Sequence, residues 1–342
     1  MPKVSVMIPV YNGENFIKES IMSVLAQTYT DYEIIVINDG STDKSEKILT
    51  PYIKKGIIRY FYQDNQGFAN AKNRAIRESE GEYIAWLDYD DVWLPNRLSK
   101  TVNIMDKDKN TVVVGSYCGY IDENGKKLPL VYPYREKGVI NFYLFPRNKI
   151  MTGSALIRKS VLLENDLWFE QQFFPADDYH MWLKLSFHGK MIIIPEILYH
   201  YRIHGNNSSI EPGVGINKQT IRKHWQAAKE ILGVSDYSHL HCNFWKRKIL
   251  SYSDWINLQK DAQKLYNLYK KLSFFSLIDK IKISLYYDAF LWSIYLKNKD
   301  IFKKNSSILE VISSLNNPAL YFSFRLTKLF IKKMENFLYA NC

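Results

Sequence analysis

The chain has 342 residues, which is long enough for one large core and a smaller helical domain. Of these residues, 46% are hydrophobic and 24% charged, and the formal net charge is +11. Its three cysteines show no framework spacing and no run of 18 or more residues is apolar, which argues against a disulfide-rich secreted protein and against a membrane-spanning helix. The opening residues, MPKVSVMIPV, enter a strand at once, so we expect no signal peptide and a cytoplasmic location.

Strand and helix patterns alternate in the first part of the chain. Residues 4–10 (VSVMIPV) and 33–38 (EIIVIN) are short apolar runs rich in β-branched residues, and each ends in a polar turn. Between them, residues 14–27 carry apolar side chains at helical spacing on one face, which predicts a βαβ unit. We therefore expect an α/β fold whose sheet is mostly parallel and flanked by helices. A further strand, helix and strand are predicted at 59–63, 67–79 and 83–87.

Polar residues follow these predicted strands directly. Ligands of parallel sheets bind beyond the carboxyl ends of the strands, so the polar residues should meet along one edge of the sheet. We expect a binding site at that edge. The residues concerned are Tyr11, Asn12, Asp39, Asp64, Asp88 and Asp90.

Three carboxylates crowd the segment 86–91 (WLDYDD), at Asp88, Asp90 and Asp91. Like charges this close repel one another, which raises their pKa values or weakens local folding unless a cation is present. Mg²⁺ and Mn²⁺ prefer oxygen ligands, and they commonly use one or two carboxylates together with the phosphates of a nucleotide. We interpret the cluster as a divalent-metal site. The alternative is a solvated acidic turn that caps a helix starting near residue 94.

Five segments in this order resemble glycosyltransferase family 2, the inverting glycosyltransferases with the GT-A fold. They lie within residues 3–205 and read VSVMIPVYNGENFIKESIMSVLAQTY, VINDGSTDKS, QDNQGFANAKNRAI, GEYIAWLDYDD and PADDYHMWLKL. The resemblance implies a GT-A domain over residues 1–205 that binds a nucleotide-diphosphate sugar, a UDP-sugar by family tendency, with Mn²⁺ or Mg²⁺. It further implies transfer of a hexosyl residue to a glycan or lipid-linked acceptor, as in bacterial surface-polysaccharide biosynthesis.

The donor has a flat base, a ribose and a diphosphate, and the resemblance implies a partner for each. Tyr11 would lie against the base, and the Asp39 carboxylate would accept a hydrogen bond from base or ribose, although Asp39 in NDGSTD also fits an Asx turn. Lys72 would add positive charge near the diphosphate at a helix start, where amide groups favour anions, or would be a solvated surface lysine. The full set implied for nucleotide binding is Pro9, Tyr11, Glu14, Asp39, Asn65, Gly67, Lys72, Asp88 and Arg202.

The same resemblance implies roles for the residues around the metal. Asp90 would be the most direct ligand, Asp88 would contact the ribose or a metal-bound water, and His204 would ligate the metal or the diphosphate. A structural role for His204 stays open. Arg202, in the segment LYHYRIHGNNSS, would hold phosphate, and residues 205–209 would form a lid. The small residues of MTGSALIR, at 151–158, suit close approach of the donor sugar or a packed strand turn.

Asp177 and Asp178 precede an amphipathic helix at 179–187, where the family carries its general base. A carboxylate can take the proton of a sugar hydroxyl during attack. We assign this role to Asp178, with Asp177 orienting it or touching the acceptor, and their repulsion would raise one of the two pKa values. The implied reaction is a single displacement that inverts the anomeric carbon. Helix N-capping by the same residues is the alternative, and it is compatible with catalysis.

The net charge comes from the last part of the chain. Residues 1–205 hold 25 Lys and Arg and 25 Asp and Glu, whereas residues 206–342 hold 21 and 10, so 21 − 10 accounts for the whole +11. Aromatic residues at helical spacing predict roughly three to five amphipathic helices and hence a separate helical domain over 206–342. Such a domain suits an anionic membrane surface, here the inner face of the cell membrane, or is a plain bundle with a lysine-rich solvated face.

The alternative hypothesis is that the chain is a non-catalytic protein that binds a nucleotide sugar or a nucleic acid through this basic, aromatic region. We expect no nucleic-acid partner, because no zinc spacing, RNP-like run or recognition helix accompanies the charge. A processive synthase of the same fold would carry Gln-x-x-Arg-Trp and membrane spans, whereas residues 219–225 read QTIRKHW. Nucleotidyl transfer is disfavoured because YNGENF is not a glycine-rich, arginine-bearing loop, and the intact Asp90 and Asp178 argue against a silent binder.

Overall fold

The computed structural model describes residues 1–129, 138–145, 148–211, 215–235, 237 and 251–277, together with scattered positions from 279 to 298. The chain divides into two compact units. The first consists of Met1–Tyr132 and Lys137–Ala227, and the second of Pro133–Glu136 and Ala228–Cys342. The division lies inside a helix, between Ala227 and Ala228, whereas the balance of charge changes at residue 206.

One mixed sheet forms the centre of the first unit. Its strand order is β3-β2-β1-β4-β9-β6-β10-β5, with β7 paired to β6 and β8 to β10. The pairs β1–β2, β1–β4, β2–β3 and β6–β10 are parallel, whereas β9 and β5 join the sheet in antiparallel register. The predicted α/β fold with a mostly parallel sheet is confirmed. The strands are β1 (Val4–Val10), β2 (Tyr32–Asp39), β3 (Arg59–Gln63), β4 (Tyr83–Trp86), β5 (Val92–Trp93), β6 (Thr111–Ile121), β7 (Lys127–Leu128), β8 (Gly138–Val139), β9 (Leu156–Arg158) and β10 (Lys190–Arg202).

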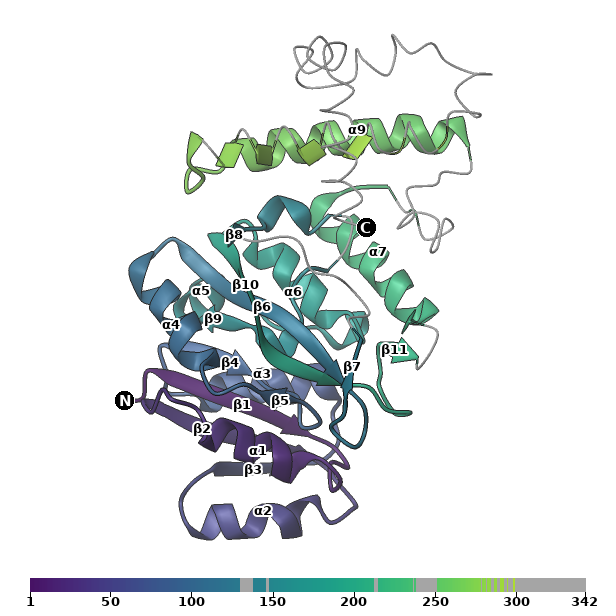
Figure 1. Ribbon diagram of the computed structural model, residues 1–342. Helices are drawn as coiled ribbons and strands as arrows, with labels where there is room; N and C mark the ends of the chain where they lie inside the picture. The colour runs from purple at the N-terminus through teal and green to yellow at the C-terminus, as the bar shows by residue number, and fades with distance from the viewer. Residues whose placement is uncertain are drawn as a thin grey trace. The chain divides into compact units, whose positions relative to one another are not determined.

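Helices connect the strands and cover the sheet. The strand order reverses after β3, so right-handed crossovers place α1 and α2 on one face and α3 on the other. Figure 1 shows α1 in front of the sheet and α3 behind it. The helices of this unit are α1 (Ile17–Leu25), α2 (Ser45–Lys54), α3 (Phe68–Glu78), α4 (Arg97–Lys107), α5 (Lys159–Glu164), α6 (Asp177–Leu185) and the first turns of α7 (Lys218–Leu232), with three 3₁₀ turns, η1 (Asn141–Tyr143), η2 (Thr152–Ser154) and η3 (Gln171–Phe173).

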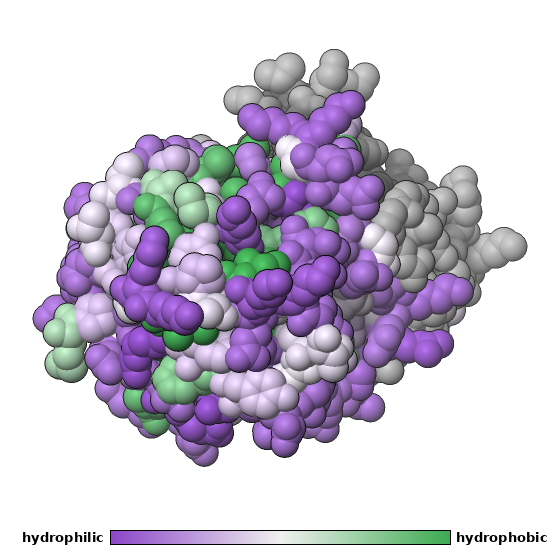
Figure 2. Space-filling view, turned by 90° about the horizontal axis from the view of Figure 1, so that it is seen from below, coloured by the Kyte–Doolittle hydropathy of each residue, from purple (hydrophilic) through white to green (hydrophobic). Residues whose placement is uncertain are grey.

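Local sequence accounts for these elements. All residues of β1 are buried, as expected for a central strand covered on both faces. In α1, Ile17, Ile21 and Val24 recur three or four positions apart, and all three are fully buried against the sheet. Leu25 fits the same spacing but is 37% exposed, because the helix ends there. Seen from below, the surface is mostly hydrophilic and its apolar residues form small separate groups (Figure 2).

The predicted irregular insertion at 122–147 contains β7, β8 and η1 in its described part, and residues 130–137 and 146–147 lie outside the described residues. A short hairpin, β11 (Ile210–Glu211) with β12 (Gly215–Ile216), follows the segment predicted to form a lid.

The longest described element of the second unit is α9 (Tyr252–Lys270). Ser251 begins it with a capping box, in which its hydroxyl accepts from the Asp254 amide while the Asp254 carboxylate accepts from the Ser251 amide. Leu258, Ala262 and Leu265 form part of its buried face. Among the described residues, every helix is too short or too polar to pass through a lipid bilayer. Most of the predicted helical segments after α9 lie outside the described residues.

Candidate active site

Side chains from three adjacent parallel strands meet at the carboxyl edge of the sheet, by which we mean the ends of β1, β2 and β4. Tyr11 follows β1, Asp39 ends β2 and Asp88 comes shortly after β4. The chain order of the strands reverses between β1 and β4, the position at which open α/β sheets bind ligands. The structure therefore brings together the residues that the sequence predicts for this edge.

The loop after β1 is tied to the start of α2. The Asn12 amide donates to the Ser41 hydroxyl at 3.0 Å, and the Glu14 carboxylate accepts from the Lys44 amide at 2.9 Å. Pro9 is buried inside β1. Tyr11 is 43% exposed, so its ring is the side chain of this loop that is free to lie against a planar ligand.

Asp91 is the fully buried member of the acidic cluster. Its carboxylate accepts hydrogen bonds from the Tyr199 hydroxyl at 2.6 Å and from the Arg202 amide at 2.9 Å. Burial, together with the charges of Asp90 and Asp88, raises its pKa. Asp91 therefore fixes the loop from inside, while Asp88 and Asp90 remain partly exposed.

Asp90 faces His204. The Asp90 Oδ2 atom lies 2.9 Å from His204 Nε2, and the Asn206 amide donates to His204 Nδ1 at 3.2 Å. This pattern places the ring proton on Nε2, shared with the carboxylate, so a metal ion bound by Nε2 would have to replace that proton. Burial raises the pKa of Asp88 to about 7. The charge of Lys72 lowers this pKa, whereas the charges of Asp90 and Asp178 raise it further. Asp90 and His204 are in contact and Asp88 lies close enough to feel the charge of Asp90, but the ligand atoms of these three residues do not all lie within 4.8 Å of one another. Carboxylate oxygens of this kind suit Mn²⁺ or Mg²⁺ completed by phosphate oxygens, and an ion would have to draw the three side chains together.

Arg202, for which the resemblance implies a phosphate contact, is held by groups of the protein. Its guanidinium is 1% exposed and donates to the Asp90 carbonyl at 2.7 Å, to the Asp122 and Glu123 carbonyls at 3.2 and 3.3 Å, and to the Glu19 carboxylate at 2.6 Å. Most of its donors are thus used within the protein. These contacts link the loop of Asp88–Asp91, called the metal loop below after the ion it is proposed to bind, to α1 and to the turn after β6, and the phosphate contact stays a prediction.

Asp39 is also occupied by protein donors. Its carboxylate accepts from the Gln63 side chain at 2.7 Å and from the Gln66 and Gly67 amides, each at 3.0 Å. Gly67 has a φ of 89°, and a Cβ there would lie 2.7 Å from the Gln171 side chain. The positive φ therefore favours glycine, whereas the end of the Gln171 side chain would have to shift to admit a Cβ. The exposed Asn65 side chain also accepts from the Gly67 amide, at 3.2 Å.

Lys72, predicted to lie near the diphosphate, forms a buried ion pair. Its Nζ atom lies 2.9 Å from the Asp177 carboxylate, and the two side chains are 2% and 4% exposed. The ammonium also lies over the rings of Phe68 and Phe169, at 4.5 and 4.8 Å from their centroids. Burial alone would lower the pKa of Lys72, but the carboxylates around it, led by Asp177, outweigh burial and raise it. Lys72 is thus the counter-ion of the acidic edge.

Asp178 is the second residue of α6, and it is held by two residues that sequence reasoning missed. Its Oδ2 atom accepts from the Asn148 amide group at 2.9 Å and from the Thr152 hydroxyl at 3.0 Å. Burial and the charge of Asp177 raise the pKa of Asp178 to about 6. Proximity in the chain could not identify Asn148 and Thr152, although Thr152 lies in the segment MTGSALIR that the resemblance had singled out.

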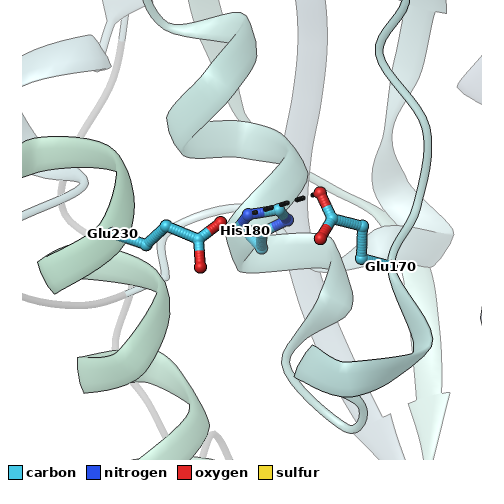
Figure 3. A group of neighbouring side chains, drawn as sticks. All are labelled: Glu170, His180 and Glu230. Carbon is cyan, nitrogen blue, oxygen red and sulfur yellow. Dashed lines mark ion pairs between the residues drawn. The ribbon is translucent and has the colours of Figure 1, made fainter.

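A further group of charged side chains, separate from Asp177 and Asp178, lies along α6. Figure 3 shows His180 on α6 beside Glu170, with Nε2 and Oε1 3.9 Å apart. The Glu170 carboxylate also accepts from Lys184 at 2.5 Å, and His180 stacks on Phe173 with ring centroids 3.8 Å apart. The third side chain drawn, Glu230, belongs to the second unit. The ion pair of Lys184 with Glu170 and the stacking of His180 on Phe173 stabilise the helix that carries Asp178.

Comparison with known proteins agrees with this geometry. Residues 5–165 match the family model described as glycosyl transferase family 2. An uncharacterized glycosyltransferase of Rickettsia typhi is 39% identical over 209 residues, which are 59% of this chain and 64% of the relative. An uncharacterized glycosyltransferase of Methanocaldococcus jannaschii is 31% identical over 263 residues, which are 72% of this chain and 84% of the relative. The chain spans 64% of two Rickettsia relatives and 31–35% of three longer ones.

Two solved structures share the fold. S. aureus TarS, residues 1–349, in complex with UDP-GlcNAc superposes with a TM-score of 0.55 at 18% identity, covering 90% of this chain and 93% of that one. The mannosyltransferase PcManGT of Pyrobaculum calidifontis, in complex with GDP-Man and Mn²⁺, gives a TM-score of 0.54 at 18% identity and covers 87% of each chain. At this identity the likeness establishes the GT-A fold.

Proposed function

This chain belongs to glycosyltransferase family 2, and on that basis we propose that it transfers a hexosyl residue from a UDP-sugar to a glycan or lipid-linked acceptor in surface-polysaccharide biosynthesis. The observation that carries the proposal is Asp178, a carboxyl group with a pKa raised to about 6 that two neutral donors hold beside the acidic carboxyl edge. A group with this pKa is a base at neutral pH and still accepts a proton readily.

Donor binding uses the carboxyl edge. The half-exposed Tyr11 ring offers a face to the base, and the loop that Asp39 stabilises lies next to it. Asp88, Asp90 and His204 would hold Mn²⁺ or Mg²⁺. Such an ion, when bound, neutralises the charge that develops on the departing diphosphate. The neighbours with the same fold support this assignment, since one contains UDP-GlcNAc and another GDP-Man with Mn²⁺.

The transfer step then follows from the position of Asp178. As the acceptor oxygen attacks the anomeric carbon, Asp178 takes its proton, the new glycosidic bond forms and the bond to the diphosphate breaks. Attack from the face opposite the diphosphate inverts the configuration in one displacement. Asn148 and Thr152 fix the carboxylate by donating to one oxygen, Oδ2, while the Tyr179 amide donates to Oδ1 at 2.6 Å. Asp178 is therefore held in one orientation before the acceptor arrives.

The first test is isothermal titration of the protein with a panel of nucleoside diphosphates, with and without Mn²⁺. We expect UDP to bind in the presence of Mn²⁺, and Asp90→Ala to weaken this binding by about 10-fold or more, because a metal ligand is lost. Asp31→Ala, which removes an exposed charge before β2, serves as the control and should bind like the natural protein. Equal binding by Asp90→Ala would refute the metal assignment, and no binding of any nucleotide by the natural protein would refute the function.

We further propose that the second unit binds the anionic inner face of the cell membrane, where lipid-linked acceptors lie. The exposed side of α9 carries Lys260 and Lys264, and Lys271, which caps the carboxyl end of the helix, is also exposed. The two acids of the same helix, Asp254 and Asp261, are buried and hydrogen-bonded. The exposed side of α9 is therefore positively charged, which favours an anionic surface.

Sedimentation with phospholipid vesicles tests this surface. Replacing Lys260, Lys264 and Lys271 with glutamine should weaken binding to vesicles rich in phosphatidylglycerol by about two orders of magnitude, at roughly 1 kcal/mol for each lysine. Glutamine at Lys44, Lys47 and Lys54 of the first unit is the matched control. Equal loss in both variants, or preferential binding to nucleic acid, would contradict the proposal.

A further inference from the structure

Two buried side chains hold the turn that positions Asp178. The Trp93 indole donates to the Gly153 carbonyl at 2.8 Å, and the Arg97 Nη2 atom donates to the Ala155 carbonyl at 2.5 Å. These carbonyls belong to η2 and to the residue after it. Both donors come from the segment that follows the metal loop, so the two halves of the proposed site are joined at this point.

Arg97 is an unusual residue for such a place. It is 0% exposed, and its Nε and Nη1 atoms have no hydrogen-bond partner among the described residues. Burial lowers its pKa to about 9. A buried cation with so few partners costs stability that an aliphatic side chain would not. Two contacts stabilise the guanidinium: the hydrogen bond to the Ala155 carbonyl and the face of Trp93, whose ring centroid lies 3.9 Å from the guanidinium carbon.

A third residue, Tyr199, packs against the same turn and also contacts the metal loop. A Cβ on Gly153 would lie 2.5 Å from the Tyr199 ring, so the turn packs directly against that ring. The Tyr199 hydroxyl donates to Asp91, the buried anchor of the metal loop. Trp93 and Tyr199 are also paired in neighbouring antiparallel strands, β5 and β10. The turn is therefore enclosed by residues whose positions the metal loop determines.

The last contact of this series is made to Asp178, the proposed base. Thr152, the first residue of η2, donates its hydroxyl to Asp178 at 3.0 Å. We propose that Trp93 and Arg97 are positioning residues that hold η2, through Gly153 and Ala155, so that Thr152 keeps Asp178 in a fixed place relative to the metal loop. This inference rests on the proposed function, because it gives Asp178 the part of the base.

The central test is Trp93→Phe, which keeps an aromatic ring beside Arg97 but removes the donor to Gly153. We expect kcat to fall by about 10- to 100-fold, the effect of a small displacement of a reacting group, while KM for the donor stays within about twofold. The acid limb of the pH profile should move above 6, because Thr152 stabilises the charged form of Asp178. Amide exchange at Ser154 and Ala155, which donate to Met151 and Thr152, should quicken by about 10-fold.

Two further variants separate positioning from general loss of stability. Thr152→Val removes the final contact, so it should move the acid limb in the same direction, and adding Trp93→Phe to it should have little further effect. Trp255→Phe removes a buried indole of α9, in the other unit, so it should lower Tm yet leave kcat and the acid limb unchanged.

Each result bears on the proposal directly. Natural kcat, acid limb and exchange rates in Trp93→Phe would overturn it, as would equal changes in Trp255→Phe. If the natural protein transfers no sugar, the proposed function fails by itself. Faster exchange at Ser154 and Ala155 in Trp93→Phe, with no such change in Trp255→Phe, would then still show that Trp93 holds the turn.

Discussion

Replacing Asp178 with asparagine is expected to lower kcat by about 10²- to 10⁴-fold, the usual contribution of a general base. The donor-binding residues are untouched, so UDP affinity and KM for the donor should stay within about twofold. Asparagine is nearly isosteric and can still bond to Asn148 and Thr152, so the fold should persist. The measurement is steady-state release of UDP with a panel of saccharide acceptors. Asp31→Asn, an exposed aspartate before β2, is the matched control.

The pH dependence of the natural protein tests the same assignment. Asp178 must be deprotonated to accept the hydroxyl proton, and burial and the charge of Asp177 raise its pKa to about 6. Activity should therefore be full above this value and decline as pH falls through it, by about tenfold for each pH unit below. Asp178→Asn should lack this limb. A variant that keeps both its rate and its acid limb would show that another group is the base, and a variant that loses UDP affinity would assign Asp178 to donor binding.

Replacing Lys72 with methionine is expected to lower the free energy of unfolding by about 3–5 kcal/mol, because it leaves the Asp177 carboxylate buried without a counter-ion. Both side chains of the pair are almost fully buried, at 2% and 4% exposed, so solvent screens the interaction very little. Methionine keeps the length and packing of the lysine stem between Phe68 and Phe169. Urea unfolding followed by circular dichroism gives the free energy directly.

A double-mutant cycle distinguishes the ion pair from a donor-binding role for Lys72. Adding Asp177→Asn to Lys72→Met removes the unpaired charge, so the double variant should recover part of the lost stability. Equal stability of the single and double variants would mean that the pair does not hold the site together. If Lys72→Met instead unfolds like the natural protein but binds UDP more weakly, the lysine contacts the diphosphate as the sequence first indicated.

Local sequence determined the frame of this protein. The β-branched runs of β1 and β2 and the helical spacing of α1 are properties of neighbouring residues, and the structure has these elements within about three residues of the predicted bounds. The alternation of strands and helices then predicts a mostly parallel sheet, and a parallel sheet brings Tyr11, Asp39 and Asp88 to one edge. These steps need only periodicity, chain order and the handedness of crossovers.

The partner of each polar side chain was decided only by the tertiary structure. Lys72 pairs with Asp177 and Arg202 with the Asp90 carbonyl, positions 105 and 112 residues apart, so no local pattern could show that these cations are already occupied. Asn148 and Thr152 reach Asp178 across 30 and 26 residues in the same way. A charged side chain's role depends on which groups fold against it and how much water is removed, and both arise when distant segments meet.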